Sequence, residues 1–169
     1  MLFENRYIRT SEDIKEAYKY QFFKRTSRVV LYALMAAMWI LYIVMSVISG
    51  DFSPLTIFMI TFIPIWFALM FFIYLRSVKI HNARESEMLG GKPLEIEFSA
   101  NDEGICIKAS DGSDISLYYS QIKMVVRTKN LIIIVTKANL MHILRKDSFT
   151  VGNEEDFLHF MLENRVKVK

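Results

Sequence analysis

The stretch Val29–Ser49, VVLYALMAAMWILYIVMSVIS, runs for 21 residues without an Asp, Glu, Lys or Arg. A second uncharged stretch of 21 residues, Leu55–Leu75 (LTIFMITFIPIWFALMFFIYL), follows after a five-residue link. A bilayer core about 30 Å thick needs roughly 20 helical residues, so each stretch is long enough to cross it. The link Gly50–Pro54 contains Gly, Pro and the acid Asp51, as expected of a tight turn at the far surface. The two stretches predict a transmembrane helical hairpin.

The rest of the chain has the composition of an ordinary soluble protein. Hydrophobic residues make up 53% of the 169 residues, above the roughly 45–50% of an average soluble domain, and the two stretches hold the excess. A cleaved signal peptide does not explain the first stretch, because it begins after 28 mostly polar residues and a second one follows. A buried hairpin is the alternative, but about 120 remaining residues would then have to cover two helices that are apolar all round.

The basic residues beside the two stretches predict the orientation. Lys24, Arg25 and Arg28 precede the first stretch, and Arg76, Lys79 and Arg84 follow the second. The connecting loop has no Lys or Arg, so the positive-inside rule places both termini in the cytoplasm of a multi-pass protein of the cell membrane.

The single cysteine agrees with this location. Cys106 excludes an intramolecular disulfide and suits a reducing compartment. Its setting, Gly-Ile-Cys-Ile-Lys, predicts an inert thiol at a buried strand position.

The two soluble segments have different patterns. Residues 1–28 predict a strand over Leu2–Arg9 and then a helix that begins at Thr10 and runs on toward the membrane. Residues 76–92 predict a juxtamembrane helix and a linker, ended by Gly90 and Gly91. Residues 93–169 form the main cytoplasmic domain, of the α+β class.

That domain reads as an antiparallel meander closed by a helix. Six short strands at hairpin spacing are predicted over Leu94–Phe98, Gly104–Lys108, Ile115–Tyr119, Ile122–Arg127, Leu131–Thr136 and Leu140–Leu144. A final helix starts at Asn153, with acids in its first turn and Phe157, Phe160 and Met161 on one side. We expect this helix to plug the open end of a strongly bent sheet, which has seven strands once the N-terminal one is added.

The joint before that helix resembles the closing motif of the YcxB-like family, whose pattern is apolar-apolar-Pro-Lys-Arg-small-Phe followed by a helix. Leu144, Lys146, Phe149 and the helical Phe157 match the pattern. Arg145 stands where Pro is usual, and Asp147 stands where a second basic residue is usual. Leu94–Phe98, Asp102–Gly104, Ser116–Ile122 and the two-span layout are also similar to the family.

This resemblance implies a fold and a topology. The family's members are bacterial membrane proteins whose cytoplasmic domain is similar to a pleckstrin-homology (PH) barrel. We therefore expect a PH-like, partly open antiparallel β-barrel, with the N-terminal strand included and the C-terminal helix as its cap. In that fold Arg145–Ser148 is an exposed corner, and Phe149 lies beneath the helix. The resemblance implies no reaction and no ligand residues.

Nothing in the sequence predicts catalysis, a cofactor, a metal or nucleic-acid binding. His81, His142 and His159 have no metal-ligand spacing with another His, Cys or acid. No nucleophile, phosphate-loop or zinc motif is present, and no basic-aromatic array suggests nucleic acid. We therefore expect a protein that is not an enzyme.

Two functions of different classes are predicted. The first is a membrane-tethered module that binds or scaffolds an unidentified protein at the inner leaflet. The second is sensing of anionic lipid headgroups or of the membrane state. The predicted headgroup or partner contacts are Lys24, Arg25, Arg28, Arg76, Lys79, Arg145 and Lys146. Oligomerisation through the hairpin, as in a small transporter or channel subunit, is a more distant alternative.

Overall fold

The computed structural model describes residues 2–50 and 52–169, with the backbone alone at Thr26 and Ser27. Asp51, the acid of the predicted loop, lies outside the described residues. Contacts divide the chain into two compact units. The hairpin unit is Tyr18–Ile80, and the β-rich unit combines Met1–Ala17 with His81–Lys169.

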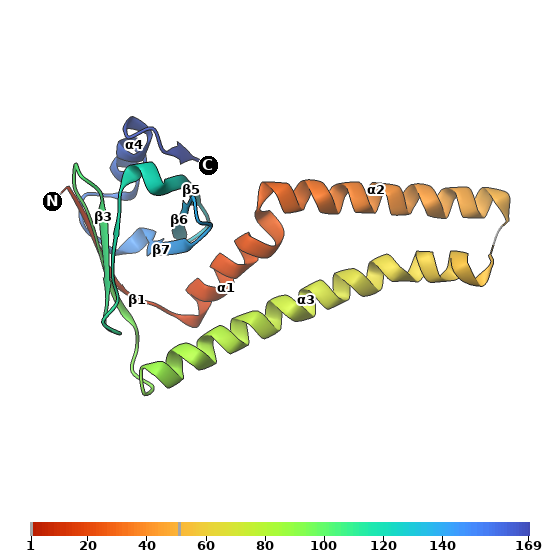
Figure 1. Cartoon of the computed structure of the whole chain (residues 1–169), viewed down its shortest axis with the longest axis horizontal. Coiled ribbons are helices and arrows are strands. Elements are labelled where there is room, and N and C mark those ends of the chain that lie inside the picture. Colours follow the sequence, from red (N-terminus) through yellow and green to blue (C-terminus); the bar gives the residue numbers. More distant parts are fainter. Residues whose placement is uncertain (1, 51) are drawn as a thin grey trace. The chain divides into compact units, whose positions relative to one another are not determined.

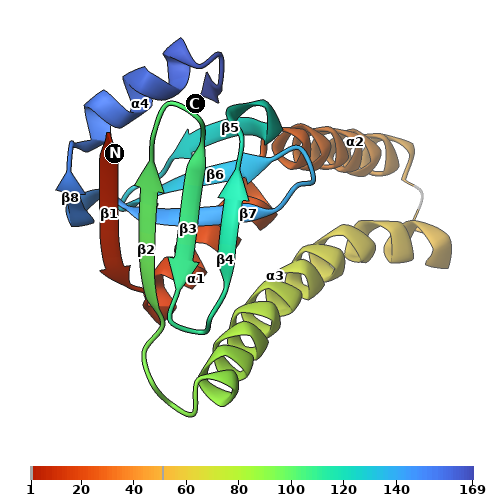
Figure 2. The same ribbon diagram turned by 60° about the vertical axis from the view of Figure 1, so that its left-hand side comes forward.

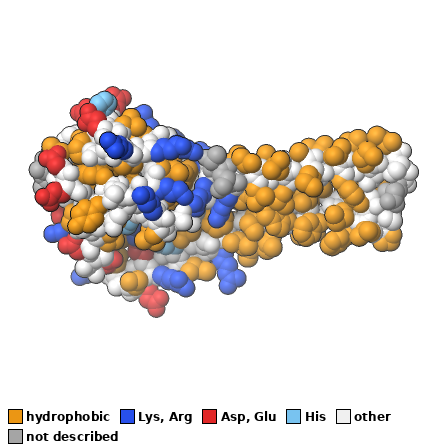
Figure 3. Space-filling view, turned by 45° about the horizontal axis from the view of Figure 1, so that its top comes forward, with side chains coloured by type: hydrophobic (Ala, Val, Ile, Leu, Met, Phe, Trp, Pro, Cys, Tyr) orange, Lys and Arg blue, Asp and Glu red, His pale blue; other side chains and the backbone are white. Residues whose placement is uncertain are grey.

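The hairpin unit contains the predicted apolar helix α2 (Thr26–Ser49) and the greater part of the second one, α3 (Pro54–Met88), whose last eight residues belong to the β-rich unit. Both are long and apolar enough to cross a membrane, and only 6% of the most apolar window of each is buried. The second span and the juxtamembrane helix, expected as separate elements, are one continuous helix of 35 residues (Figure 1). Apolar side chains cover the length of the hairpin in Figure 3.

Polar and aromatic contacts pair α2 with α3 as antiparallel neighbours. The rings of Tyr32 and Trp66 lie 5.7 Å apart, and Tyr42 donates to the hydroxyl of Thr56 over 3.4 Å. Between these levels, the indole N–H of Trp39 donates to the carbonyl of Ile60 over 2.9 Å. This is the carbonyl that Pro64, four residues later, leaves without a helical donor. Trp39 and Trp66 are therefore packing residues between the two helices.

The helix that precedes α2 runs on toward it, as predicted, but it is not a uniform α-helix. Helix α1 (Ser11–Lys19) starts as predicted at Thr10, whose N–H and hydroxyl both donate to the Asp13 carboxylate, over 2.8 and 2.9 Å. It then widens into a π-helical turn, Tyr20–Lys24. At Arg25 the backbone becomes extended, with ψ at 123°, and this ends the helical path before α2 begins.

The β-rich unit has two sheets instead of one meander. One sheet has the order β4-β3-β2-β1-β8, and the other has the order β7-β6-β5-β9 (Figure 2). The strands of the first are β1 (Phe3–Ile8), β2 (Glu95–Ala100), β3 (Ile105–Ala109), β4 (Asp114–Leu117) and β8 (Phe149–Val151). The strands of the second are β5 (Ile122–Arg127), β6 (Leu131–Thr136), β7 (Met141–Arg145) and β9 (Lys167–Val168).

The predicted strands are all present, and β1 pairs with β2 along its whole length. A 3-10 turn at Tyr119–Gln121 separates β4 from β5 and ends the first sheet. Strands β8 and β9, which have three and two residues, were not predicted.

Strands β1 and β7 meet at the border of the two sheets. Hydrogen bonds from side chains join them, and no backbone ladder does so among the described residues. The amide of Asn5, which is fully buried, donates to the carbonyl of Arg145 over 2.7 Å. The hydroxyl of Tyr7 donates to the carbonyl of Ile143. Burial raises the pKa of the Tyr7 phenol above its ordinary value, which keeps it a donor. These two bonds satisfy carbonyls on the outer edge of β7 that no strand covers.

The core lies between the sheets and under the last helix, α4 (Glu154–Glu163). The side chain of Asn153 accepts the N–H of Asp156 and caps α4, as predicted. Phe157 is fully buried, and its ring centroid lies 5.5 to 5.8 Å from the centroids of three other rings. Those rings belong to Phe3, Phe98 and Phe149. The predictions that α4 covers the core and that Phe149 lies beneath it are confirmed.

Candidate functional site

Five of the seven predicted contact residues gather at one end of the hairpin unit. The rings of Phe22 and Phe23 lie 6.0 and 5.5 Å from the ring of Tyr74, which brings the chain before α2 beside α3. The basic residues on both sides of this aromatic contact therefore lie at the same end of the hairpin. We call this set the basic collar, and its members are Lys24, Arg25, Arg28, Arg76 and Lys79.

The basic collar is largely available to a ligand. Lys24, Arg76 and Lys79 are exposed, and none of these three forms an ion pair with an acid of the described residues. The guanidinium of Arg28 lies 5.1 Å from the centre of the Phe22 ring, a cation–π contact that leaves its charge uncompensated.

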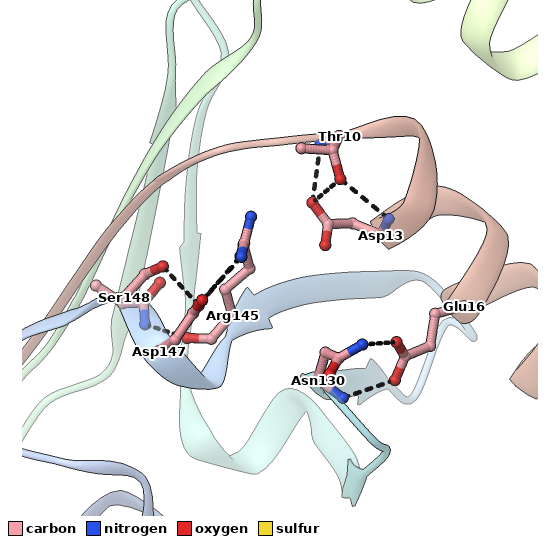
Figure 4. A network of polar contacts seen from close by, with 8 residues as sticks. Thr10, Asp13, Glu16, Asn130, Arg145, Asp147 and Ser148 are labelled. Atoms are coloured by element: carbon pink, nitrogen blue, oxygen red, sulfur yellow. Dashed lines mark hydrogen bonds and ion pairs between the residues drawn. The ribbon is translucent and has the colours of Figure 1, made fainter.

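The other two predicted contacts belong to the β-rich unit, and acids within that unit already pair with them. Arg145 donates to both carboxylate oxygens of Asp147, over 3.1 and 2.8 Å (Figure 4). The hydrogen bond from Arg145 holds the pKa of the Asp147 carboxyl below its ordinary value. The Arg145 side chain is 30% exposed. Its guanidinium also has a favourable electrostatic interaction with the buried Asp13 of α1.

Lys146 is more deeply engaged. Its ammonium lies 3.1 Å from a carboxylate oxygen of Glu154, and Arg127 approaches the same oxygen at 2.7 Å. The side chains of Lys146 and Glu154 are 16% and 17% exposed. Three of the four residues at the corner 145–148, expected to be exposed, are half-buried. Lys146 ties the corner to the start of α4, and Arg127 ties β5 to the same carboxylate.

Helix α1 is fixed to the second sheet by a further carboxylate. The backbone N–H and side-chain amide of Asn130 donate to the two oxygens of Glu16, over 2.9 and 3.0 Å (Figure 4). Desolvation raises the pKa of Glu16, but the hydrogen bonds from Thr128 and Asn130 outweigh it, and the net shift is downward. The polar groups around α1 thus organise the fold.

The outer edge of β4 is an open surface that the sequence did not reveal. Strand β4 is the edge strand of the first sheet, next to β3 (Figure 2). Ile115 and Tyr118 are 36% and 65% exposed. The N–H of Ala109 donates to Ser113, so the backbone groups of Ile115 and Leu117 face β3. By the same alternation, the N–H and C=O groups of Asp114 and Ser116 face away from the sheet.

A recess of about 460 Å³ lies beside this edge. Its floor is a row of small side chains in register across three strands: Ser99, Cys106 and Ser116. Its walls include Asn101, Glu103 and Tyr118. We call β4 and this recess together the edge site.

The edge site corrects the prediction for Cys106. Ile105 and Ile107 point into the core, so Cys106 between them lies half-buried on the outer face. Its thiol lies 3.4 Å from a carboxylate oxygen of Asp114. Desolvation and this carboxylate raise the pKa of the thiol, so the expected lack of reactivity has a physical basis.

The histidines lie apart from one another. His81 is 3.5 Å from Glu85 at the end of α3, and His159 is 3.3 Å from Glu163 on α4. His142 lies on β7, where burial lowers its pKa. Among residues 2–50 and 52–169, no group of three or more His, Cys, Asp or Glu side chains has an arrangement that could hold a metal ion.

The chain thus combines an apolar helical hairpin of membrane-spanning length with a two-sheet α+β unit capped by a helix. Residues 100–161 match the family model described as YcxB-like protein, which confirms the resemblance predicted from the sequence. The match runs from the end of β2 to Met161 on α4 and so covers most of the β-rich unit. No curated protein and no solved structure matches the chain.

Proposed function

We propose that this is a non-enzymatic integral membrane protein that presents a PH-like module for protein binding or scaffolding at the inner leaflet. In this proposal α2 and α3 cross the bilayer with both termini in the cytoplasm. The two sheets and α4 are the PH-like module. The exposed apolar side chains along the hairpin support the membrane assignment, because water solvates such a surface poorly and lipid covers it at no cost.

The open edge of β4 is the observation that carries the binding function. Unpaired strand edges are templates for a further strand, and proteins usually blunt them with a very short strand, charged side chains, Pro, a bulge or a covering segment. Strand β4 has four residues and carries one charge, that of Asp114. The strand sequence Asp-Ile-Ser-Leu contains neither Lys nor Pro, and β4 pairs with β3 without a bulge. An added segment of a partner would also cover the exposed Ile115 and Tyr118.

Photocrosslinking in native membranes tests the binding function. A photoreactive amino acid is placed in turn at Ser116 in the edge site, at Leu140 in the β6–β7 turn and at Leu162 on the outer face of α4. All three are exposed, whereas the fully buried Leu144 serves as the control position. We expect a reproducible crosslinked protein from at least one exposed position and none from Leu144. Absence of a crosslink at every exposed position would contradict protein binding.

The basic collar supports a second function, contact with anionic lipid headgroups. Each Lys or Arg near an anionic surface contributes about 1 kcal/mol, so five gathered residues constitute a substantial attraction. We expect Lys79→Glu with Arg76→Glu to abolish enrichment of anionic lipid around the protein in mixed vesicles. The matched change Lys129→Glu, at an exposed position in the β5–β6 turn, is expected to leave enrichment unchanged. Equal enrichment in all variants would contradict a role for the collar.

A further inference from the structure

The edge site differs in charge from the rest of the chain. Residues 94–118, which form β2, β3, β4 and their turns, contain six acidic residues and a single Lys, although the whole chain carries a net charge of +3. The acids are Glu95, Glu97, Asp102, Glu103, Asp111 and Asp114, and the base is Lys108. Two of these acids, Glu103 and Asp114, belong to the edge site itself, whose β4 and recess residues include no Lys or Arg, so the edge site attracts cationic partners.

These two acids lie toward opposite ends of β4. Asp114 lies on β4 itself, and its only ion-pair partner among the described residues is Lys108, at a long 3.8 Å. Glu103 lines the recess at the other end of the strand and has no ion-pair partner among the described residues. On the outer face of a strand added to β4, basic side chains would meet Asp114 and, across the recess, Glu103.

The two faces of β4 require two kinds of side chain from such a strand. On the inner face an added strand would meet Ile115 and Leu117, which lie at the margin of the core. On the outer face it would meet Asp114, Ser116 and the recess with Glu103. Side chains of a strand alternate between the two faces, so the matching segment alternates apolar and basic residues.

We propose that the edge site binds an extended segment of a protein partner in which apolar residues alternate with Lys or Arg. The segment adds as a strand to β4 through the N–H and C=O groups of Asp114 and Ser116. Its apolar side chains cover Ile115 and Leu117, and its basic side chains face Asp114 and the recess with Glu103. This proposal rests on the proposed protein-binding function and names the chemistry of the partner.

The test uses full-length protein in nanodiscs of neutral phosphatidylcholine, so that lipid does not attract a basic probe. The probe is a fluorescent peptide of eight residues with the sequence KVKVKVKV, blocked at both ends, and its anisotropy reports binding. The comparison peptides are EVEVEVEV, which reverses the charge, and KVKPKVKV, which breaks the strand at one valine. Empty nanodiscs correct for binding to lipid.

We expect KVKVKVKV to bind, with an affinity that falls as salt increases, and both comparison peptides to bind at least tenfold more weakly. Ser116→Pro is expected to weaken binding about tenfold, because it removes an outward N–H that β3 does not use. Glu103→Lys, which leaves the backbone unchanged, is expected to have a similar effect. The matched control Glu163→Lys, at the exposed end of α4, is expected to bind like the unmodified protein.

Equal binding of KVKVKVKV and EVEVEVEV would overturn the proposal, as would binding that neither Ser116→Pro nor Glu103→Lys weakens. Glu103→Lys also decides the outcome if the proline variant is not folded. Crosslinks at Leu140 or Leu162 without any at Ser116 would overturn the edge site while leaving the protein-binding function intact. Absence of crosslinks at all three positions would contradict the function itself.

Discussion

Phe157→Ala is expected to destabilise the β-rich unit by about 3–5 kcal/mol, the range for removal of a buried phenyl ring. Phe157 is fully buried, and its ring meets those of Phe3, Phe98 and Phe149, which come from β1, β2 and β8. The substitution therefore leaves a cavity where the first sheet meets α4. Since small domains have a total stability of about 5–15 kcal/mol, this loss is a large fraction of it.

Hydrogen exchange of full-length protein in detergent micelles measures this effect. The amides of β6 are the best reporters because all six residues of that strand are buried. Tryptophan fluorescence would not report it, because Trp39 and Trp66 both lie in the hairpin unit. Leu162→Ala on the same helix is the control, since Leu162 is 54% exposed and its loss should change stability by less than about 0.5 kcal/mol. Unchanged exchange in Phe157→Ala would contradict the role of α4 as the cover of the core.

Met38→Arg is expected to prevent stable insertion of the hairpin. Met38 is 72% exposed near the middle of α2, where the proposal places hydrocarbon. An Arg at the centre of a transmembrane helix costs roughly 2.5–3.5 kcal/mol in insertion measurements. We expect the fraction of protein that resists extraction from membranes at high pH to fall sharply.

The same substitution separates the membrane assignment from a soluble one. On the surface of a soluble protein, replacing an exposed Met by Arg changes stability by no more than about 0.5 kcal/mol. Leu140→Arg is the matched control, because Leu140 is 61% exposed in a turn of the β-rich unit and should tolerate the charge. If Met38→Arg behaved like Leu140→Arg, the exposed surface of α2 would not face lipid.

Local patterns were sufficient for most of the fold. The spans followed from two long uncharged stretches, and β5 and β6 have the predicted bounds because Thr128–Asn130 is a clear turn between two apolar runs. The cap at Asn153 likewise marked the start of α4. In each case the signal lies within a few residues of the element that it defines.

Non-local features were not predictable. Strand β8 pairs with β1 from the other end of the chain, and β9 pairs in parallel with β5 through only two residues. Segments this short have no hydrophobic period, and their partners alone stabilise them. The division into two sheets was not predictable for a similar reason. An edge strand and a central strand can have the same sequence, so the sequence of β4 does not show that one of its edges is open.

The candidate site shows the same limit at the level of side chains. Arg145 and Lys146 have the sequence context of solvated turn residues. In the fold both are half-buried, and they pair with Asp147 and Glu154. Glu154 is one of the acids in the first turn of α4, and in the fold it also pairs with Lys146 and Arg127. The basic collar was predictable, because its members flank the spans directly and the hairpin brings the two flanks together.

The central claim is that the hairpin crosses the membrane and that the β-rich unit lies on the inside. Cysteine accessibility tests this claim most directly. Cys106 is the only cysteine, so Cys106→Ser gives a background free of thiols. One new cysteine is then placed at Phe52 in the loop or at Ser120 in the β-rich unit, both exposed. With a membrane-impermeant maleimide on intact cells, we predict labelling of Phe52→Cys at once and of Ser120→Cys only after lysis. Labelling of Ser120→Cys in intact cells, or protection of Phe52→Cys until lysis, would contradict the account.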